Sequence, residues 1–141
     1  MEILTLIKII LFGGSTVLTP TPVDIRSEPI LIEFEKPIDA ITKGASINID
    51  VTPYISSQIA SDGFKEIDST FPSGCVKAIV KSKKDERITL SKSSGRWGGK
   101  KKMLNLRSES GVPTGVKFVT MQLISCKEIN NTVITWYNYS K

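Results

Sequence analysis

A cationic segment in the second half of the chain is the part of the sequence best equipped to bind a ligand by charge. Residues 77–102 hold ten basic and two acidic residues, which gives this segment a net charge of +8. The whole chain has a net charge of +5, so the remaining residues carry −3. Such cations can bind the phosphates of a nucleic acid or anionic lipid headgroups, and an aromatic ring among them can stack on a base. We predict a polyanion-binding site at five of these residues: Arg96, Trp97, Lys100, Lys101 and Lys102. The alternative interpretation is a solvated turn whose lysines keep sheet edges from pairing with other chains.

Groups for catalysis and metal binding are sparse. The chain has no histidine, which excludes Ser-His-Asp and Cys-His nucleophiles and histidine metal ligands. Gly98-Gly99-Lys100 lacks the other residues of a phosphate-binding P-loop. The spacing of Asp62, Glu66 and Asp68 matches no calcium loop, and we interpret them as an exposed acidic turn. We predict no catalytic residues, metal site or cofactor, and a small-molecule substrate is not expected.

Cys75 and Cys126 are the only cysteines in the chain. Each lies at one end of a segment with strand character, and an even number of cysteines in an exported chain predicts a disulfide. Disulfides persist in oxidising compartments. The alternative is a pair of reduced thiols buried in the core.

The first nineteen residues form an apolar leader. Lys8 interrupts the apolar run and Gly13-Gly14 follows it, so the run is shorter than the roughly 20 apolar residues of a membrane-spanning helix. We interpret residues 1–19 as an export signal, a membrane tether or a docking arm. The leader and the pair of cysteines together predict an extracytoplasmic protein, which is periplasmic, at the cell surface or secreted, and which the leader can tether to a membrane. The alternative is a virion or cytoplasmic location.

The rest of the chain shows the apolar-polar alternation that is typical of strands. Residues 20–29 form an extended Pro/Thr spacer, and residues 53–74 lack a sustained period and are predicted to be mainly loop. The segment 115–126 is apolar on both faces and should be a central strand. We predict an all-β domain over residues 30–141, an antiparallel β-sandwich or a partly open barrel of about seven strands. The alternating segments are 30–35, 46–51, 75–83, 87–92, 103–107, 115–126 and 132–139.

The last predicted strand is rich in aromatic residues. Residues 128–131 are expected to be a turn that joins segments 115–126 and 132–139 in a hairpin. Tyr137 and Tyr139 are candidates for a partner-binding surface, because tyrosine combines apolar area with a polar tip.

The sequence therefore favours a protein that works by binding. We predict a non-enzymatic, exported or membrane-tethered interaction module, or a subunit of an envelope or surface assembly, whose partner is another protein or a second copy. The first alternative is a basic nucleic-acid-binding or virion structural protein that contacts phosphate through residues 77–102. The second alternative is an enzyme that uses carboxylates or lysine.

Overall fold

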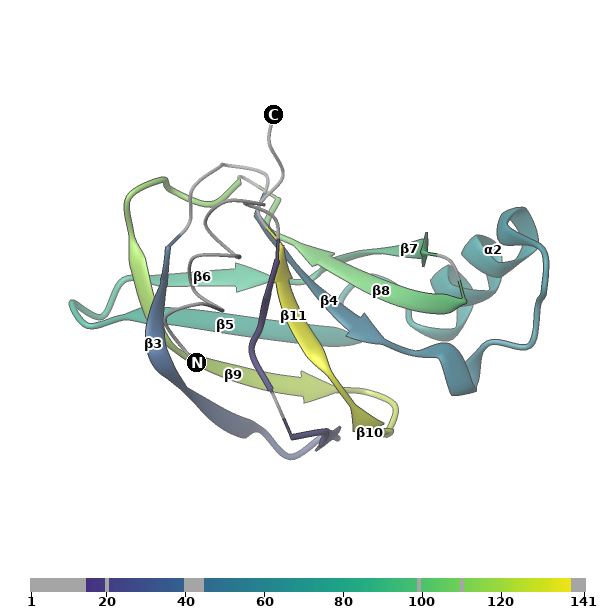
Figure 1. Ribbon diagram of the computed structural model, residues 1–141, viewed down its shortest axis with the longest axis horizontal. Helices are drawn as coiled ribbons and strands as arrows, with labels where there is room; N and C mark the ends of the chain where they lie inside the picture. Colours follow the sequence, from purple (N-terminus) through teal and green to yellow (C-terminus); the bar gives the residue numbers. More distant parts are fainter. Residues whose placement is uncertain (1–14, 20, 40–44, 99, 110, 138–141) are drawn as a thin grey trace.

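The computed structural model describes residues 15–19, 21–39, 45–98, 100–109 and 111–137. These residues form eleven strands, a short 3-10 helix and one α-helix, and every pairing between the strands is antiparallel. The described strands form three sheets that do not close into a barrel (Figure 1). The prediction of a mostly β fold is confirmed, although the strands are more numerous than the sequence indicates and a helix is present.

The larger sheet has five strands. Its order is β1-β11-β4-β8-β7, so strands from both ends of the chain are neighbours in it. The N-terminal residues that the sequence assigns to the leader supply its first strand. The members are β1 (Ser15–Val17), β11 (Ile134–Tyr137), β4 (Ser46–Asp50), β8 (Lys101–Arg107) and β7 (Lys92–Gly98).

The second sheet has four strands in the order β3-β9-β5-β6. Its central strand β9 (Lys117–Ser125) pairs on one side with β3 (Ile30–Asp39) and on the other with β5 (Val76–Ser82), and β6 (Arg87–Leu90) lies beyond β5. The central position expected for segment 115–126 is thus confirmed. A third sheet consists of β2 (Val23–Ile25) and β10 (Ile129–Thr132).

One apolar core is shared by the two larger sheets. Trp136 of β11 and Phe118 of β9 lie 5.9 Å apart between ring centroids, and both side chains are fully buried. The inward rows of β4 and β8 face the inward rows of β5 and β9, as the alternation of apolar residues predicts. Their fully buried members include Ile47, Ile49, Leu104, Leu106, Ala78, Val80, Met121 and Leu123.

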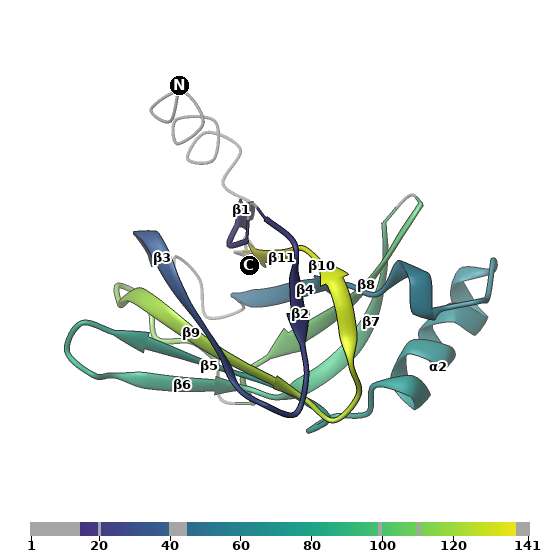
Figure 2. The same cartoon turned by 90° about the horizontal axis from the view of Figure 1, so that it is seen from below.

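The pairing of the first three strands with the last three is nested. β1 pairs with β11, β2 with β10 and β3 with β9, so the earliest strand meets the latest one (Figure 2). Leu18 and Thr19 continue this contact beyond β1, since the Leu18 amide donates to the Ile134 carbonyl and the Ile134 amide donates to the Thr19 hydroxyl. Residues 15–19 and part of the 20–29 spacer therefore belong to the folded sheets, whereas leader residues 1–14 lie outside the described residues.

Two sequence predictions are wrong in this part of the fold. Residues 128–131 do not make a tight hairpin turn, because most of them form β10 and pair with β2. As a result β9 and β11 lie in different sheets. Residues 93–98, which lie outside the strands predicted from the sequence, are also in a strand, since β7 runs through them and pairs with β8 along its whole length.

The segment predicted to be mainly loop contains the 3-10 helix η1 (Thr52–Tyr54) and the helix α2 (Ala60–Thr70). α2 buries only Gly63 and Ile67, and Ile67 packs against Gly95 of β7. A Cβ atom at Gly95 would lie 3.1 Å from the Ile67 side chain and 3.3 Å from the Phe64 Cα atom, so the glycine allows this close approach. Phe64, Ile67 and Phe71 recur at helical spacing, and the last two are buried in the core, so the period was present although the segment was predicted to be mainly loop.

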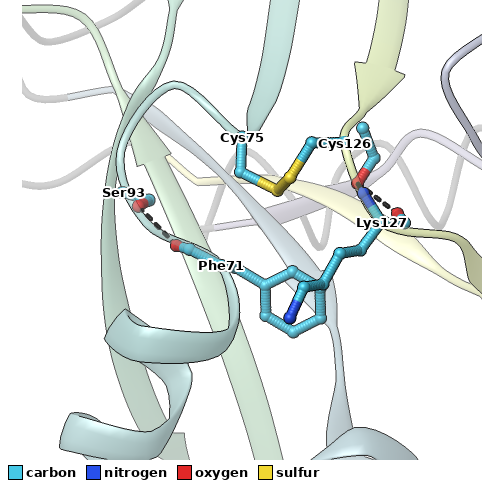
Figure 3. The surroundings of a disulfide bond; sticks show 6 residues. Phe71, Cys75, Ser93, Cys126 and Lys127 are labelled. Carbon is cyan, nitrogen blue, oxygen red and sulfur yellow. Dashed lines mark hydrogen bonds between the residues drawn. A yellow bond between two sulfur atoms is a disulfide. The ribbon is translucent and has the colours of Figure 1, made fainter.

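The predicted disulfide between Cys75 and Cys126 is present, and the Cα atoms of the two residues are 4.9 Å apart. It joins the chain just before β5 to the chain just after β9, at the end where these strands pair through Val76 and Ser125. The bond lies near Phe71, which ends α2 and whose carbonyl accepts a hydrogen bond from the Ser93 hydroxyl (Figure 3). Closing a loop of 51 residues should stabilise the fold by about 4 kcal/mol in the chain-entropy model.

Candidate functional site

The residues predicted to bind polyanions lie on the β7–β8 hairpin, but they do not form one surface. Lys100 and Lys101 are exposed at its tip, whereas Lys102 is only 8% exposed. The Trp97 side chain lies outside the described residues. The set therefore reduces to two exposed lysines at the tip and two cations, Lys102 and Arg96, that contact the protein itself.

The Lys102 ammonium binds backbone carbonyls of the segment that precedes α2. Its Nζ atom donates to the Ile55 carbonyl at 3.1 Å and to the Ser57 carbonyl at 2.8 Å. Lys102 shares a face of β8 with Leu104 and Leu106, which are both fully buried, because side chains two residues apart on a strand point the same way. That alternation is visible in the sequence and is the signal that this lysine points inward.

Arg96 and Tyr137 were predicted for two different sites, and the fold brings them together. The Arg96 guanidinium carbon lies 5.8 Å from the centroid of the Tyr137 ring, a cation–π contact between β7 and β11. Burial lowers the pKa of Arg96, an effect that Tyr137 opposes and Arg107 adds to. Both side chains are half-buried. Tyr139 lies outside the described residues.

A buried polar cluster connects the middle strands of the same sheet. Asn105 of β8 is 1% exposed, and its side-chain Nδ2 donates to the Ser46 hydroxyl at 2.9 Å and to the side-chain Oδ1 of Asn48 at 2.8 Å. Buried amides are expensive unless they are hydrogen-bonded. This cluster fixes the register of β4 against β8 and has no need of a ligand to satisfy the Asn105 amide.

The acidic residues predicted to lie in an exposed turn are in α2 instead. The Glu66 carboxylate accepts hydrogen bonds from the backbone amides of Ser56 and Ser57, each at 2.9 Å, and from their hydroxyls. The Ser56 amide is the largest cause, followed by the Ser57 hydroxyl, of a Glu66 pKa that is lowered to about 2. Asp62 and Asp68 are exposed, and among the described residues no group of three potential ligands could hold a metal ion.

The side of the molecule between β1 and β3 is incompletely covered. These strands are edges of the two larger sheets, and a cavity of about 310 Å³ lies between them. β3 contributes Phe34 and Ile38, which are only half-buried although they pack on the core, and Val17 of β1 is 54% exposed. We call this feature the β1–β3 groove. Its lining residues are Val17, Leu18, Glu33, Phe34, Glu35, Lys36 and Ile38.

The sequence did not indicate this groove, because its two walls come from segments assigned to separate parts of the chain. Val17 and Leu18 fall in the predicted leader, and β3 was predicted as an ordinary strand that ends before Pro37. β3 instead continues to Asp39, with an irregular register between Glu33 and Ile38. An edge strand tolerates the proline because one row of its backbone groups is unpaired.

Comparisons with known proteins add no relative. No protein-family model, curated protein or solved structure matches the chain. Within the described part of the chain, no helix is long and apolar enough to cross a membrane. The disulfide is consistent with an oxidising compartment outside the cytoplasm.

Proposed function

We propose that this protein is a non-enzymatic β-sandwich, exported or tethered to a membrane, that binds another protein at the β1–β3 groove. The observation that carries the proposal is the half-exposed inward row of β3, next to a cavity between two sheet edges. In a packed pair of sheets this row should be buried. An added strand of a partner would bury it.

The occupant that fits is an extended segment of another chain. β3 is an edge of its sheet and can donate and accept backbone hydrogen bonds, while alternate side chains of the added strand would enter the cavity beside Phe34 and Ile38. Recognition of this kind takes affinity from the backbone and specificity from the side-chain pockets. The lining holds the carboxylates of Glu33 and Glu35 and one cation, Lys36, so its net negative charge favours a segment that is apolar with a flanking cation.

The groove supports this proposal better than the cations support nucleic-acid binding. A protein that tracks a phosphate backbone needs its cations along one continuous surface. Here the exposed Lys100 and Lys101 lie at the tip of the β7–β8 hairpin, and the lysines of the β5–β6 turn lie at the opposite end of the molecule (Figure 1). Lys102 points into the protein.

Photo-crosslinking in cells of the native host tests the proposal. A photoreactive amino acid at Val17, inside the groove, should give a discrete adduct with a partner protein. The matched control places the same amino acid at Thr89, an exposed position on β6, which is the other edge of the β3 sheet. The proposal is wrong if Val17 gives no adduct, or if both positions give the same adducts.

A further inference from the structure

A second cavity lies at the end of the four-stranded sheet that is farthest from the disulfide. It has a volume of about 580 Å³ and collects residues from the β5–β6 turn, the loop before β9 and the end of β3. We call it the basic hollow. Its polar lining consists of Ser82, Lys83, Lys84, Glu86, Thr114 and Lys117.

None of the three lysines of the basic hollow forms a salt bridge with a described residue. Asp85, at the apex of the β5–β6 turn, is engaged elsewhere, since its carboxylate lies 3.1 Å from the Lys81 ammonium and 3.3 Å from the Arg87 guanidinium. The hydrogen bond from Lys81 is the main cause of a lowered Asp85 pKa. Asp39 pairs in register with Lys117 but does not line the hollow. Glu86 is the one carboxylate in the lining against three cations.

Hydrogen bonds of the Ser82 hydroxyl order the β5–β6 turn, which carries Lys83 and Lys84. The Ser82 hydroxyl, which is almost fully buried, accepts hydrogen bonds from the backbone amides of Lys84 and Glu86 and donates to the Glu86 carboxylate. Asp85 adopts a positive φ of 68° at the apex. A side-chain oxygen that accepts hydrogen bonds from two nearby backbone amides holds the backbone in a tight turn. Lys83 and Lys84 are therefore presented from an ordered backbone.

We propose that the basic hollow binds a phosphate-bearing ligand. Ammonium groups that converge from separate segments neutralise a multiply charged oxyanion, and lysine is a common phosphate ligand in proteins. The volume falls in the range of small-ligand sites, roughly 300–1,000 Å³. Val116, Val119 and Pro37 supply an apolar wall for the uncharged part of the ligand, and the Thr114 hydroxyl is available as a further donor. The phosphate can belong to a soluble compound or to a lipid headgroup.

Calorimetric titration of the full, disulfide-bonded chain with inorganic tripolyphosphate tests the site. The hollow variant Lys83→Ser/Lys84→Ser/Lys117→Ser should lose at least about tenfold in affinity, because each phosphate contact by a cation contributes to binding and to its salt dependence. The control variant Lys65→Ser/Lys92→Ser/Lys127→Ser removes the same charge from exposed positions that do not line the hollow. It should stay within about twofold of the wild type, since exposed charges beyond a Debye length are largely screened.

A single substitution in the lining should change the affinity for tripolyphosphate in the opposite direction. Glu86→Gln removes the carboxylate from the lining and should raise the affinity for tripolyphosphate. Equal losses in the hollow and control variants, or no effect of Glu86→Gln, would show attraction to net charge alone and overturn the proposal.

Vesicles of neutral lipid with and without phosphatidylglycerol identify the source of the phosphate. Binding to the anionic vesicles that is lost in the hollow variant assigns the site to a headgroup, and tripolyphosphate binding without vesicle binding assigns it to a soluble compound. If neither probe binds at low salt, the proposal is wrong.

Discussion

The two lysine-rich hairpins of this protein have similar composition and opposite uses of their cations. In the β7–β8 hairpin, Lys102 points inward and holds carbonyls of the segment before α2. In the β5–β6 hairpin, Lys83 and Lys84 line the basic hollow, and the Asp85 carboxylate forms salt bridges with Lys81 and Arg87. Charge density alone therefore does not identify a binding surface, because the neighbouring elements decide which cations remain available.

The anchors of the two hairpins differ as well. The β5–β6 hairpin begins next to Cys75 and is anchored covalently through Cys126 to the end of β9. The β7–β8 hairpin is anchored by the buried Lys102 ammonium and by the contact of Gly95 with Ile67 of α2. Breaking each anchor separately tests whether they act on stability rather than on ligand binding.

Loss of the covalent anchor should have the largest effect. Cys75→Ala/Cys126→Ala frees a loop of 51 residues in the unfolded chain, and we expect the free energy of unfolding to fall by about 4 kcal/mol. Denaturant unfolding of the oxidised wild type and the variant measures the difference, and wild type with its disulfide reduced is the control and should match the variant. A loss below about 1 kcal/mol would show that the bond is not an anchor of the fold.

Loss of the Lys102 ammonium should come second. Lys102→Met keeps the aliphatic length of the side chain but leaves the Ile55 and Ser57 carbonyls without their donor, at a cost of about 2–3 kcal/mol. Lys101→Met, one residue earlier and exposed, should change stability by no more than about 0.5 kcal/mol. Similar losses in the two variants would refute the inward role of Lys102. A test of polyanion binding at the hairpin tip should therefore change Lys100 and Lys101 and leave Lys102 in place.

Loss of the Glu66 carboxylate should have the smallest effect on stability. Glu66 lies on α2 and binds the amides of Ser56 and Ser57, in the segment that Lys102 also contacts. Its pKa is about 2 in the folded protein against 4.5 for an unperturbed glutamate. A carboxylate whose pKa is lower in the folded state stabilises the fold at pH values above its pKa in the unfolded chain. This stabilisation is lost as the pH falls through its pKa in the folded protein. The wild type should exceed Glu66→Gln in stability at neutral pH, and the gap should narrow between pH 4.5 and about 2.

Thermal unfolding across this pH range measures the gap. Asp68→Asn, an exposed carboxylate on the same helix, is the control and should show no such narrowing. A gap for Glu66→Gln that stays constant down to pH 2 would contradict the contribution of its carboxylate.

The sequence predicted the features that depend on local alternation. Segment 115–126, apolar on both faces, is the central strand β9, and Cys75 with Cys126 forms the disulfide. The partners of each strand were less accessible, because pairing depends on contacts distant in sequence. Asn130 and Asn131 favour a turn by residue type, yet Ile129 and Thr132 pair with β2 and place this segment in a sheet.

The candidate sites show the same limit. Lys102 was predicted to bind polyanions, although Leu104 and Leu106, which share its face of the strand, were the signal that it points inward. The basic hollow could not be predicted, because Lys117 meets Lys83 and Lys84 only through the pairing of β9 with β5. α2 has a short apolar stripe of Phe64, Ile67 and Phe71 that could have predicted it, but Gly63 and the turn residues around the stripe favoured a loop.

The nested pairing of the first strands with the last ones sets the order in which the chain can fold. β1, β2 and β3 have their partners in β11, β10 and β9, so none of them can pair until its partner, at residue 117 or beyond, has been synthesised. Contacts between residues so distant in sequence form slowly, because the loop between them must be closed first. A growing chain therefore emerges from the ribosome with β1, β2 and β3 unpaired, whereas β4, β7 and β8 and the β5–β6 hairpin can already pair. The late arrival of β9 also postpones the meeting of Cys75 with Cys126.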